Sequence, residues 1–252
     1  MRSKNSSKTQ SYPKPPHCIR LFRIMSRTHF EVIESNIGSA LEHGYANSKV
    51  FVGSLALADA QAECDSLRWW RKNQENRGIG GHRVFRPNPS TLAERTLYRP
   101  KPVRGLIDLG RKIEKKVQEA GERRGIEILK NWSMNHIVIN KIPVAEDPLT
   151  PSIKEHLDPK YYTGVLEVVS LGAGELLLGE TDDQLIVPTE EGGLETFICD
   201  DLATAMTDMG QPVAQVKHAV RVSEPRFSII YASDTRPPQT FAEIARTQLQ
   251  NR

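Results

Sequence analysis

The sequence predicts an α+β fold in which helices come first, a β-rich core follows and a further helix ends the chain. Residues 105–124 are expected to form the clearest helix, because apolar residues recur there on one face: Leu106, Leu109, Ile113, Val117 and Ala120. From about residue 131, short apolar segments are separated by turn residues, a pattern typical of a sandwich or barrel. Residues 240–243 fit a capping box, so a C-terminal helix is expected there.

The β-rich part is divided by glycine- and aspartate-containing turns at residues 172–174, 181–183 and 192–193. Seven segments are expected to be strands: residues 135–142, 165–171, 175–178, 184–187, 194–199, 216–222 and 227–232. Upstream, Phe51 and Val52 are a short strand candidate, and a helix is expected from Ser54 or Asp59 to Leu67. Residues 30–45 remain ambiguous, and the segment leading up to the helix at 105–124 reads as a basic, loop-like stretch from about residue 70.

Composition excludes several classes of protein. Of the 252 residues, 38% are hydrophobic and 26% charged, and no apolar run approaches the length needed to cross a bilayer, so no membrane partner is expected. The three cysteines, Cys18, Cys64 and Cys199, form no CxxC pair, which argues against a disulfide framework or a zinc ribbon and favours an intracellular, reducing compartment. The net charge of +3 is too small to indicate a nucleic-acid partner by itself.

The first 29 residues form a separate, basic segment. They contain seven Lys or Arg and no acidic residue, and they are rich in Ser and Pro. Such a segment cannot bury enough apolar surface to order itself, so we expect a disordered tail, with residues 30–252 as a single domain whose β core spans about 131–235. A nucleic-acid-binding arm or an organellar transit peptide are the alternatives. We therefore expect cytoplasm or nucleus, with the mitochondrion as the alternative.

The motif His156-Leu157-Asp158, followed by His218, is the main candidate for chemistry. Residues i and i+2 of a strand point to the same side, so His156 and Asp158 can face one ion. Two imidazoles and one carboxylate occupy one face of an octahedral metal, and this ligand set is typical of non-heme Fe(II) oxygenases. The alternative is that the HxD triplet occurs by chance and that its histidine is an ordinary surface or core residue.

Arg226 and Ser228 add a second group of polar side chains. The strands expected at 216–222 and 227–232 bracket a turn at residues 223–225, so Arg226 directly precedes the second strand. The planar guanidinium binds a carboxylate through two parallel hydrogen bonds, which suits it to hold an oxyacid co-substrate beside a metal. A cupin-like metal protein in which Arg226 has no such role is the competing interpretation.

Together these motifs resemble the Fe(II)/2-oxoglutarate-dependent dioxygenase superfamily and, more narrowly, its AlkB-like branch. The resemblance covers about residues 50–235. It rests on the HxD motif with Tyr161-Tyr162 and residues 170–172 after it, and on three further segments: residues 51–69, residues 98–102 with the helix that follows, and residues 135–140. It implies a double-stranded β-helix (jelly-roll) core with N-terminal helices and a C-terminal helix.

The resemblance also implies roles for individual residues. His156, Asp158 and His218 would bind Fe(II), and Arg226 would hold the distal carboxylate of the 2-oxoglutarate co-substrate, with O2 as the second co-substrate. Ser228 and Asn140 would assist Arg226. The implied activity is hydroxylation of a C–H bond, including oxidative demethylation of alkylated nucleic acid.

The chain departs from the AlkB-like pattern at two positions, where Ile142 and Ala232 replace a usual tyrosine and a usual second arginine. A protein or small-molecule hydroxylase, or a catalytically silent nucleic-acid-binding relative, are therefore the alternatives.

Substrate contacts are expected from four aromatic residues: Tyr161, Tyr162, Trp69 and Trp70. The tryptophans lie among many arginines and lysines, and aromatics beside cations suit single-stranded RNA or DNA and flipped bases. The alternative is that Trp69 closes a helix onto the core and that the basic loops are merely solvated. His136 is expected to be a packed core histidine, and Asp200 and Asp201 to lie in a turn. The sequence indicates no oligomeric state.

Overall fold

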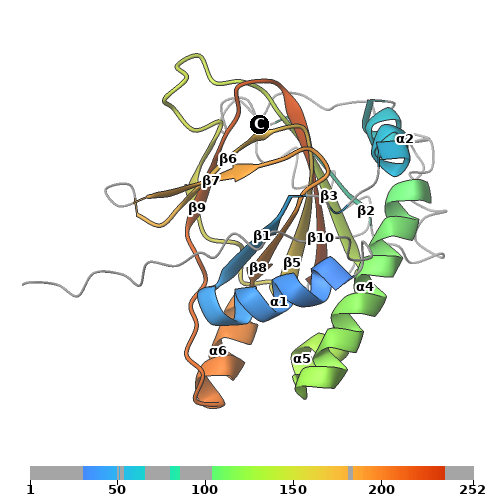
Figure 1. The fold of residues 1–252 in the computed structure, drawn as a ribbon, viewed down its shortest axis with the longest axis vertical. Coiled ribbons are helices and arrows are strands. Elements are labelled where there is room, and N and C mark those ends of the chain that lie inside the picture. Colours follow the sequence, from blue (N-terminus) through green and yellow to red (C-terminus); the bar gives the residue numbers. More distant parts are fainter. Residues whose placement is uncertain are drawn as a thin grey trace, which may run out of the picture.

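The computed structural model describes residues 31–49, 51, 54–65, 80–85, 104–180 and 184–235, which form two antiparallel sheets with helices against the larger one (Figure 1). The helices are α1 (Glu31–His43), α2 (Ser54–Asp65), α4 (Arg104–Arg124), α5 (Glu127–Lys130) and α6 (Asp200–Asp208). The strands are β1 (Tyr45–Ser48), β2 (Gly80–Phe85), β3 (His136–Ile142), β4 (Ile153–His156), β5 (Tyr162–Leu171), β6 (Gly174–Leu178), β7 (Leu185–Thr189), β8 (Leu194–Ile198), β9 (His218–Arg221) and β10 (Arg226–Asp234).

The strands alternate between the two sheets along the chain. The larger sheet has the order β1-β8-β5-β10-β3-β2, and the smaller sheet has the order β4-β9-β6-β7. Consecutive strands from β3 to β10 therefore cross repeatedly from one sheet to the other, while β6 and β7 form a hairpin within the smaller sheet. This crossing brings residues far apart in the sequence to the same end of the sandwich.

Two buried cores result from this arrangement. One lies between the larger sheet and the helices α1 and α4, and the other lies between the two sheets. Strand β5 contributes side chains to both cores, because alternate residues point to opposite faces of a sheet. Val165 and Val169 pack toward the helices, whereas Leu166 packs into the inter-sheet core. The functional candidates below lie on the inter-sheet side.

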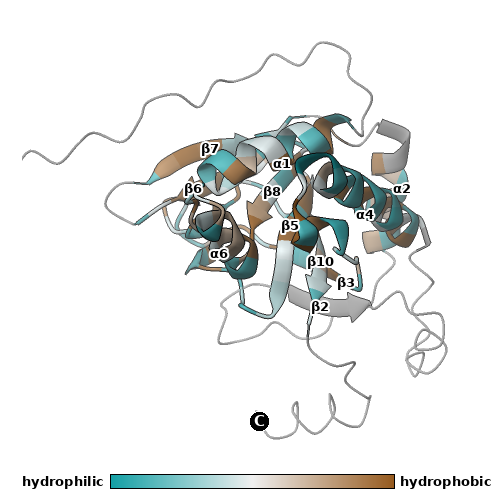
Figure 2. Ribbon diagram, turned by 90° about the horizontal axis from the view of Figure 1, so that it is seen from below, coloured by the Kyte–Doolittle hydropathy of each residue, from teal (hydrophilic) through white to brown (hydrophobic). Residues whose placement is uncertain are grey.

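Helix α4 confirms the helix predicted from the apolar stripe. Leu106, Ile113 and Val117 are fully buried, while the outward residues are polar (Figure 2). The first backbone N–H groups of a helix have no partner within it. Here the carboxylate of Glu63 in α2 accepts the N–H groups of Gly105 and Leu106 at 2.9 and 3.1 Å.

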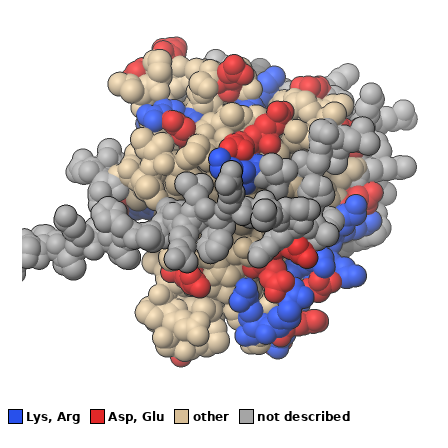
Figure 3. All heavy atoms as spheres, viewed as in Figure 1, with Lys and Arg blue, Asp and Glu red and all other residues tan. Residues whose placement is uncertain are grey.

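Basic and acidic side chains are interspersed along α4 and α5, toward the lower right of Figure 3. Three of the basic residues of α4 pair with acidic neighbours: Arg111 with Asp108, Lys116 with Glu119, and Arg123 with Glu34. This described face is therefore mixed in charge and does not have the uniformly basic character of a phosphate-binding stripe.

All seven expected strands are present, with their ends displaced by a few residues. The ambiguous segment at 30–45 forms α1 and the start of β1, and part of the segment read as loop-like forms β2 at the edge of the larger sheet. Strands β1 and β2, which precede the β core expected at about 131–235, are thus the two edge strands of the larger sheet. Phe51 lies outside any strand.

Asp200 and Asp201 were predicted to lie in a turn, but they begin helix α6. Acidic side chains in the first turn favour the start of a helix, and Asp201 Oδ1 also accepts the N–H groups of Gly164 and Leu202 at 3.0 and 2.8 Å.

Some predictions lie outside the described residues: the N-terminal tail, Val52, Trp69, Trp70, residues 86–103, residues 181–183 and the C-terminal helix. Among the helices that the structure describes, none combines the length and the apolar composition that a membrane span requires.

Candidate metal centre

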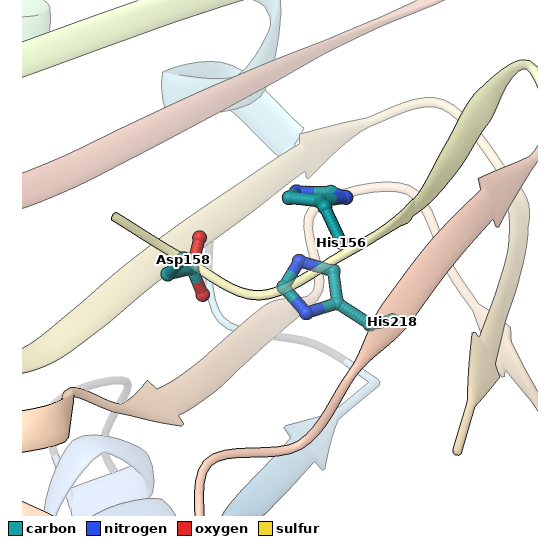
Figure 4. A group of neighbouring side chains, drawn as sticks. All are labelled: His156, Asp158 and His218. Atoms are coloured by element: carbon teal, nitrogen blue, oxygen red, sulfur yellow. The ribbon is translucent and has the colours of Figure 1, made fainter. Parts of the chain in front are cut away.

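His156, Asp158 and His218 lie together at one end of the smaller sheet (Figure 4). His156 ends β4 and His218 begins β9, and the two residues are direct cross-strand partners. Their ring centroids are 4.4 Å apart. Asp158 follows in the extended segment after β4, and one ligand atom from each of the three residues lies within 4.8 Å of the others. The predicted convergence is therefore present, although their role as metal ligands stays a prediction.

The backbone orients both imidazoles. Nδ1 of His156 lies 2.8 Å from the carbonyl oxygen of Lys154, and Nδ1 of His218 lies 3.1 Å from that of Val216. A carbonyl oxygen only accepts, so each Nδ1 carries the proton and donates it. Each Nε2 then keeps a free lone pair, which is the arrangement found in metal-binding histidines. The two histidines can thus bind one ion in matching tautomers.

The electrostatics of the three side chains favour a bound cation. Burial raises the pKa of Asp158, while the neighbouring His218 and His156 lower it. Burial lowers the pKa of His218, and Asp158 opposes that shift. A carboxylate destabilised by burial beside neutral histidines is stabilised by a metal ion, which needs deprotonated ligands. The residues present therefore fit a divalent metal of the kind that imidazole and carboxylate bind.

Aromatic and thiol groups complete the surroundings of the centre. The ring of Phe197 packs on that of His218 with centroids 4.3 Å apart, and supports it from the larger sheet. Cys199, two residues after Phe197, is fully buried and packs in the same inter-sheet core. Burial, and then Asp158, raise the pKa of its thiol, so Cys199 stays protonated and is a poor metal ligand.

Arg226 lies at the start of β10 with 4% of its surface exposed. Its Nη1 donates to Thr189 Oγ1 at 2.6 Å, to Ser170 Oγ at 3.1 Å and to the carbonyl oxygen of Gly172 at 3.3 Å. The side chain can fold over this turn because residue 172 is a glycine with φ +116°, where a Cβ would meet Arg226 Cβ at 2.8 Å. The guanidinium is thus held by residues of β5, of β7 and of the turn that follows β5.

Three buried polar atoms at and around this arginine have no hydrogen-bond partner among the described residues: Arg226 Nε, the Tyr45 hydroxyl and Glu195 Oε2. Burial and then Glu195 raise the pKa of Tyr45, so its hydroxyl remains a donor. Burial lowers the pKa of Arg226, and Glu195 and Tyr45 oppose that shift. Because unsatisfied buried donors are rare in proteins, the donors of Arg226 and Tyr45 fit a ligand that offers an acceptor at that point, such as a carboxylate.

The arginine group and the metal centre share the inter-sheet core. Tyr45 packs on Phe197 with ring centroids 4.9 Å apart, and Phe197 packs in turn on His218. Phe197 therefore connects the two groups of side chains.

The structure places the remaining predicted residues less directly. Ser228 and Asn140 are cross-strand partners on the same sheet face as Arg226, and the Asn140 amide donates to Ser228 Oγ at 3.5 Å. The hydrogen bonds of Arg226 go instead to Ser170, Thr189 and Gly172, so the assisting role of Ser228 and Asn140 stays a prediction.

The two tyrosines predicted to contact substrate stack edge-on, with centroids 4.7 Å apart, and Tyr162 is buried in the inter-sheet core. His136 is a packed core histidine, as predicted. It is 1% exposed, and its Nδ1 lies 2.6 Å from Asp234 Oδ2. Trp69 and Trp70, the other two substrate candidates, lie outside the described residues.

Sequence reasoning missed four residues of the arginine group: Tyr45, Ser170, Thr189 and Glu195. Tyr45 lies in the segment left ambiguous, where no pattern marked it. For Glu195 a signal was available, because a charged residue interrupts the apolar strand expected at 194–199. A charge inside a buried strand requires a partner, and such a residue is a candidate for a site.

Comparison with known proteins extends only to the fold. No protein-family model and no curated protein matches this chain in sequence. The dioxygenase for auxin oxidation 1 from Arabidopsis thaliana, solved as a complex with 2-oxoglutarate, aligns with TM-score 0.59 and 12% identity over 86% of this chain and 92% of that one.

Two further structures are similar. A full-length protein of Neurospora crassa, solved in complex with alpha-KG (2-oxoglutarate), aligns with TM-score 0.51 and 13% identity over 81% of this chain and 79% of that one. A prolyl-4-hydroxylase of Pseudomonas putida aligns with TM-score 0.53 and 14% identity over 81% of this chain and 100% of that one. The chain therefore shares its fold with 2-oxoglutarate-dependent oxygenases. None of these three is described as an AlkB-type protein, and that narrower resemblance stays a prediction.

Proposed function

We propose that this protein is an Fe(II)- and 2-oxoglutarate-dependent dioxygenase that hydroxylates a C–H bond. The observation that carries the proposal is the convergence of His156, Asp158 and His218 on the inter-sheet side of the fold, where a buried arginine also has an unused N–H group. The metal ligands alone would fit other metalloproteins, and the arginine alone would fit many anion sites. Their combination supports one keto-diacid bound between them.

The chain's own residues would have distinct roles. His156 and His218 would bind iron through Nε2 and Asp158 through a carboxylate oxygen, which leaves three octahedral positions open. Arg226 and Tyr45 would donate to the distal carboxylate of 2-oxoglutarate, and the apolar core would exclude water. When bound, iron with 2-oxoglutarate and O2 supplies an oxidation that converts the co-substrate to succinate and CO2 and inserts oxygen into a C–H bond.

We also infer that β3 to β10 form a jelly roll. The order β8-β5-β10-β3 in one sheet facing β4-β9-β6-β7 in the other supports this, since two four-stranded sheets joined by repeated crossings are the arrangement of that fold.

Purified full-length protein with Fe(II) and 2-oxoglutarate tests the activity. We expect O2-dependent formation of succinate, which His156→Ala and Asp158→Ala abolish. His43→Ala is the matched control, because this exposed histidine contacts only Glu42 among the ion pairs of the structure. Succinate formation that survives both metal-centre substitutions contradicts the proposal. A wild-type protein that forms no succinate but binds nucleic acid tightly supports a silent binding relative instead.

For the substrate we favour a small organic molecule. Ile142 and Ala232, which stand where the AlkB-like pattern has a tyrosine and an arginine, are both fully buried and present no polar group to a base. Structural neighbours include a dioxygenase for auxin oxidation and a complex of JOX2 with 2-oxoglutarate, Fe and JA.

Demethylation of alkylated nucleic acid is the second candidate, and a prolyl or other protein side chain is the third. The second rests on the basic and aromatic residues around Trp69 and Trp70 in the sequence, and the third on the prolyl-4-hydroxylase fold neighbour. Substrate-stimulated succinate formation separates the three, with auxin, a methylated single-stranded oligonucleotide and a proline-containing peptide as probes. Formaldehyde released from the oligonucleotide would establish the second candidate.

A further inference from the structure

Glu195 is a carboxyl group one hydroxyl away from Arg226. Strand β8 alternates, so that Leu194 and Ile198 pack toward the helices while Glu195 and Phe197 point into the inter-sheet side. Glu195 is 1% exposed. Its Oε1 accepts the hydroxyl of Ser170 at 2.9 Å, and the same hydroxyl oxygen accepts Arg226 Nη1 at 3.1 Å. Within the part of the chain that the structure describes, its Oε2 has no hydrogen-bond partner, and the same holds for Arg226 Nε and the Tyr45 hydroxyl.

The charges around Glu195 do not balance once a co-substrate binds. Among the described residues, the titratable groups that act on it are Arg226 from β10 and Tyr45 from β1, while β5 offers only the uncharged hydroxyl of Ser170. An ionised Glu195 and Arg226 are neutral as a pair. The distal carboxylate of 2-oxoglutarate would then place two anions beside one cation in a buried site, which is strongly unfavourable.

A proton on Glu195 removes this conflict. The cation then faces a single anion, and Oε2–H becomes a third donor beside Arg226 Nε and the Tyr45 hydroxyl. The pKa of Glu195 is raised to about 7, because burial raises it by more than Arg226 and Ser170 lower it. Near neutral pH the group is therefore close to half-protonated before any ligand arrives, and a second carboxylate nearby raises its pKa further.

We propose that Glu195 is a proton-binding residue of the co-substrate pocket, which takes up one proton when the distal carboxylate of 2-oxoglutarate binds Arg226 and donates Oε2–H to that carboxylate. This inference rests on the proposed function. It makes co-substrate affinity dependent on pH. A group whose pKa rises on binding takes up a proton, so binding is tightest below the pKa of free Glu195 and weakens as the pH rises above it.

Isothermal titration of 2-oxoglutarate into the full-length protein loaded with Mn(II) tests this without turnover. Each titration is done between pH 6.5 and 8.5 in two buffers of different ionisation enthalpy, which reports the protons taken up. With a free pKa of about 7, we expect the wild-type Kd to rise about 25-fold over this range, with uptake of nearly one proton at pH 8. Glu195→Gln keeps the size and an N–H donor, and should lose most of both effects.

Two variants serve as controls. Glu167 is another fully buried carboxyl, on β5, with its pKa raised to about 8, but it bonds Thr196 on the helix-facing side of the sheet. Glu167→Gln should therefore keep the wild-type pH dependence. Tyr45→Phe removes a donor from the pocket but no titrating group, so it should weaken binding similarly at every pH.

The outcomes separate this inference from the proposed function. A wild-type protein that binds 2-oxoglutarate with an unchanged Kd and without proton uptake overturns the role of Glu195 and leaves the oxygenase proposal intact. So does a Glu195→Gln variant that keeps the wild-type pH dependence. The wild-type measurement decides the question even if that variant does not fold. A wild type that binds Mn(II) but not 2-oxoglutarate at any pH refutes the proposed function itself.

Discussion

Replacement of Arg226 by lysine measures what the guanidinium contributes beyond its charge. Lysine keeps a cation in the site but loses the planar fork, and its single nitrogen must replace the contacts to Ser170, Thr189 and Gly172 as well as the free Nε. A hydrogen bond to a charged group contributes roughly 1.5–3 kcal/mol. Loss of one such bond to the co-substrate therefore predicts that the KM for 2-oxoglutarate rises about 10- to 150-fold.

Succinate formation against 2-oxoglutarate concentration is the assay, and the split between KM and kcat is the readout. At saturating co-substrate kcat should change little, because Arg226 is not a metal ligand. Arg221→Lys is the matched control, since the Arg221 side chain on β9 pairs with Glu175 at 2.6 Å rather than with a residue of the arginine group. An unchanged KM in Arg226→Lys, and again in Arg226→Ala, would refute the assigned role and favour the cupin-like alternative.

Two further substitutions test the packing behind the site. Gly172→Ala should destabilise the fold by about 1–3 kcal/mol and weaken 2-oxoglutarate binding, because φ is +116° and the new Cβ would meet Arg226; urea unfolding and titration measure the two effects, and a fully stable variant contradicts the geometry. Glu167 has its pKa raised to about 8 by burial, so the stability that it contributes is present at low pH and declines as the pH rises through its folded pKa. Urea unfolding of Glu167→Gln should therefore show a stability that varies less between pH 5 and 8 than that of the wild type, and an identical pH profile would contradict this.

The parts of the fold that depend on local pattern were predictable from sequence. Helix α4 has an apolar stripe at helical spacing, and the strands after residue 131 are separated by glycine-containing turns. Helix α1 was not identified, although Val32, Ile33 and Ile37 are buried at helical spacing on it. Its short apolar groups lie directly beside a basic tail, and they gain stability mainly from packing on the larger sheet rather than from helix propensity.

The site was predictable where the chemistry is encoded by residue type and spacing. The HxD motif and a distant histidine were sufficient to predict that His156, Asp158 and His218 come together, because a metal centre requires these residue types to converge. The surroundings of Arg226 were not predictable, since Tyr45, Thr189 and Glu195 come from three different strands and meet only through sheet order. Contacts of this kind depend on strand pairing over long sequence distances, which a single sequence does not specify.

The unpaired polar atoms between the sheets lead to a last prediction, on stability. Each buried donor without a partner costs about 1–3 kcal/mol, so a ligand that accepts from Arg226 and Tyr45 should stabilise the fold. With Mn(II) present, 2-oxoglutarate at 100 times its Kd should add about 2.7 kcal/mol and raise Tm by several degrees. Pyruvate has the same keto acid end but no distal carboxylate, so at equal concentration it should raise Tm much less. Arg226→Ala should remove the difference between the two keto acids. If pyruvate stabilises the wild type as much as 2-oxoglutarate does, the distal carboxylate does not bind this group of side chains.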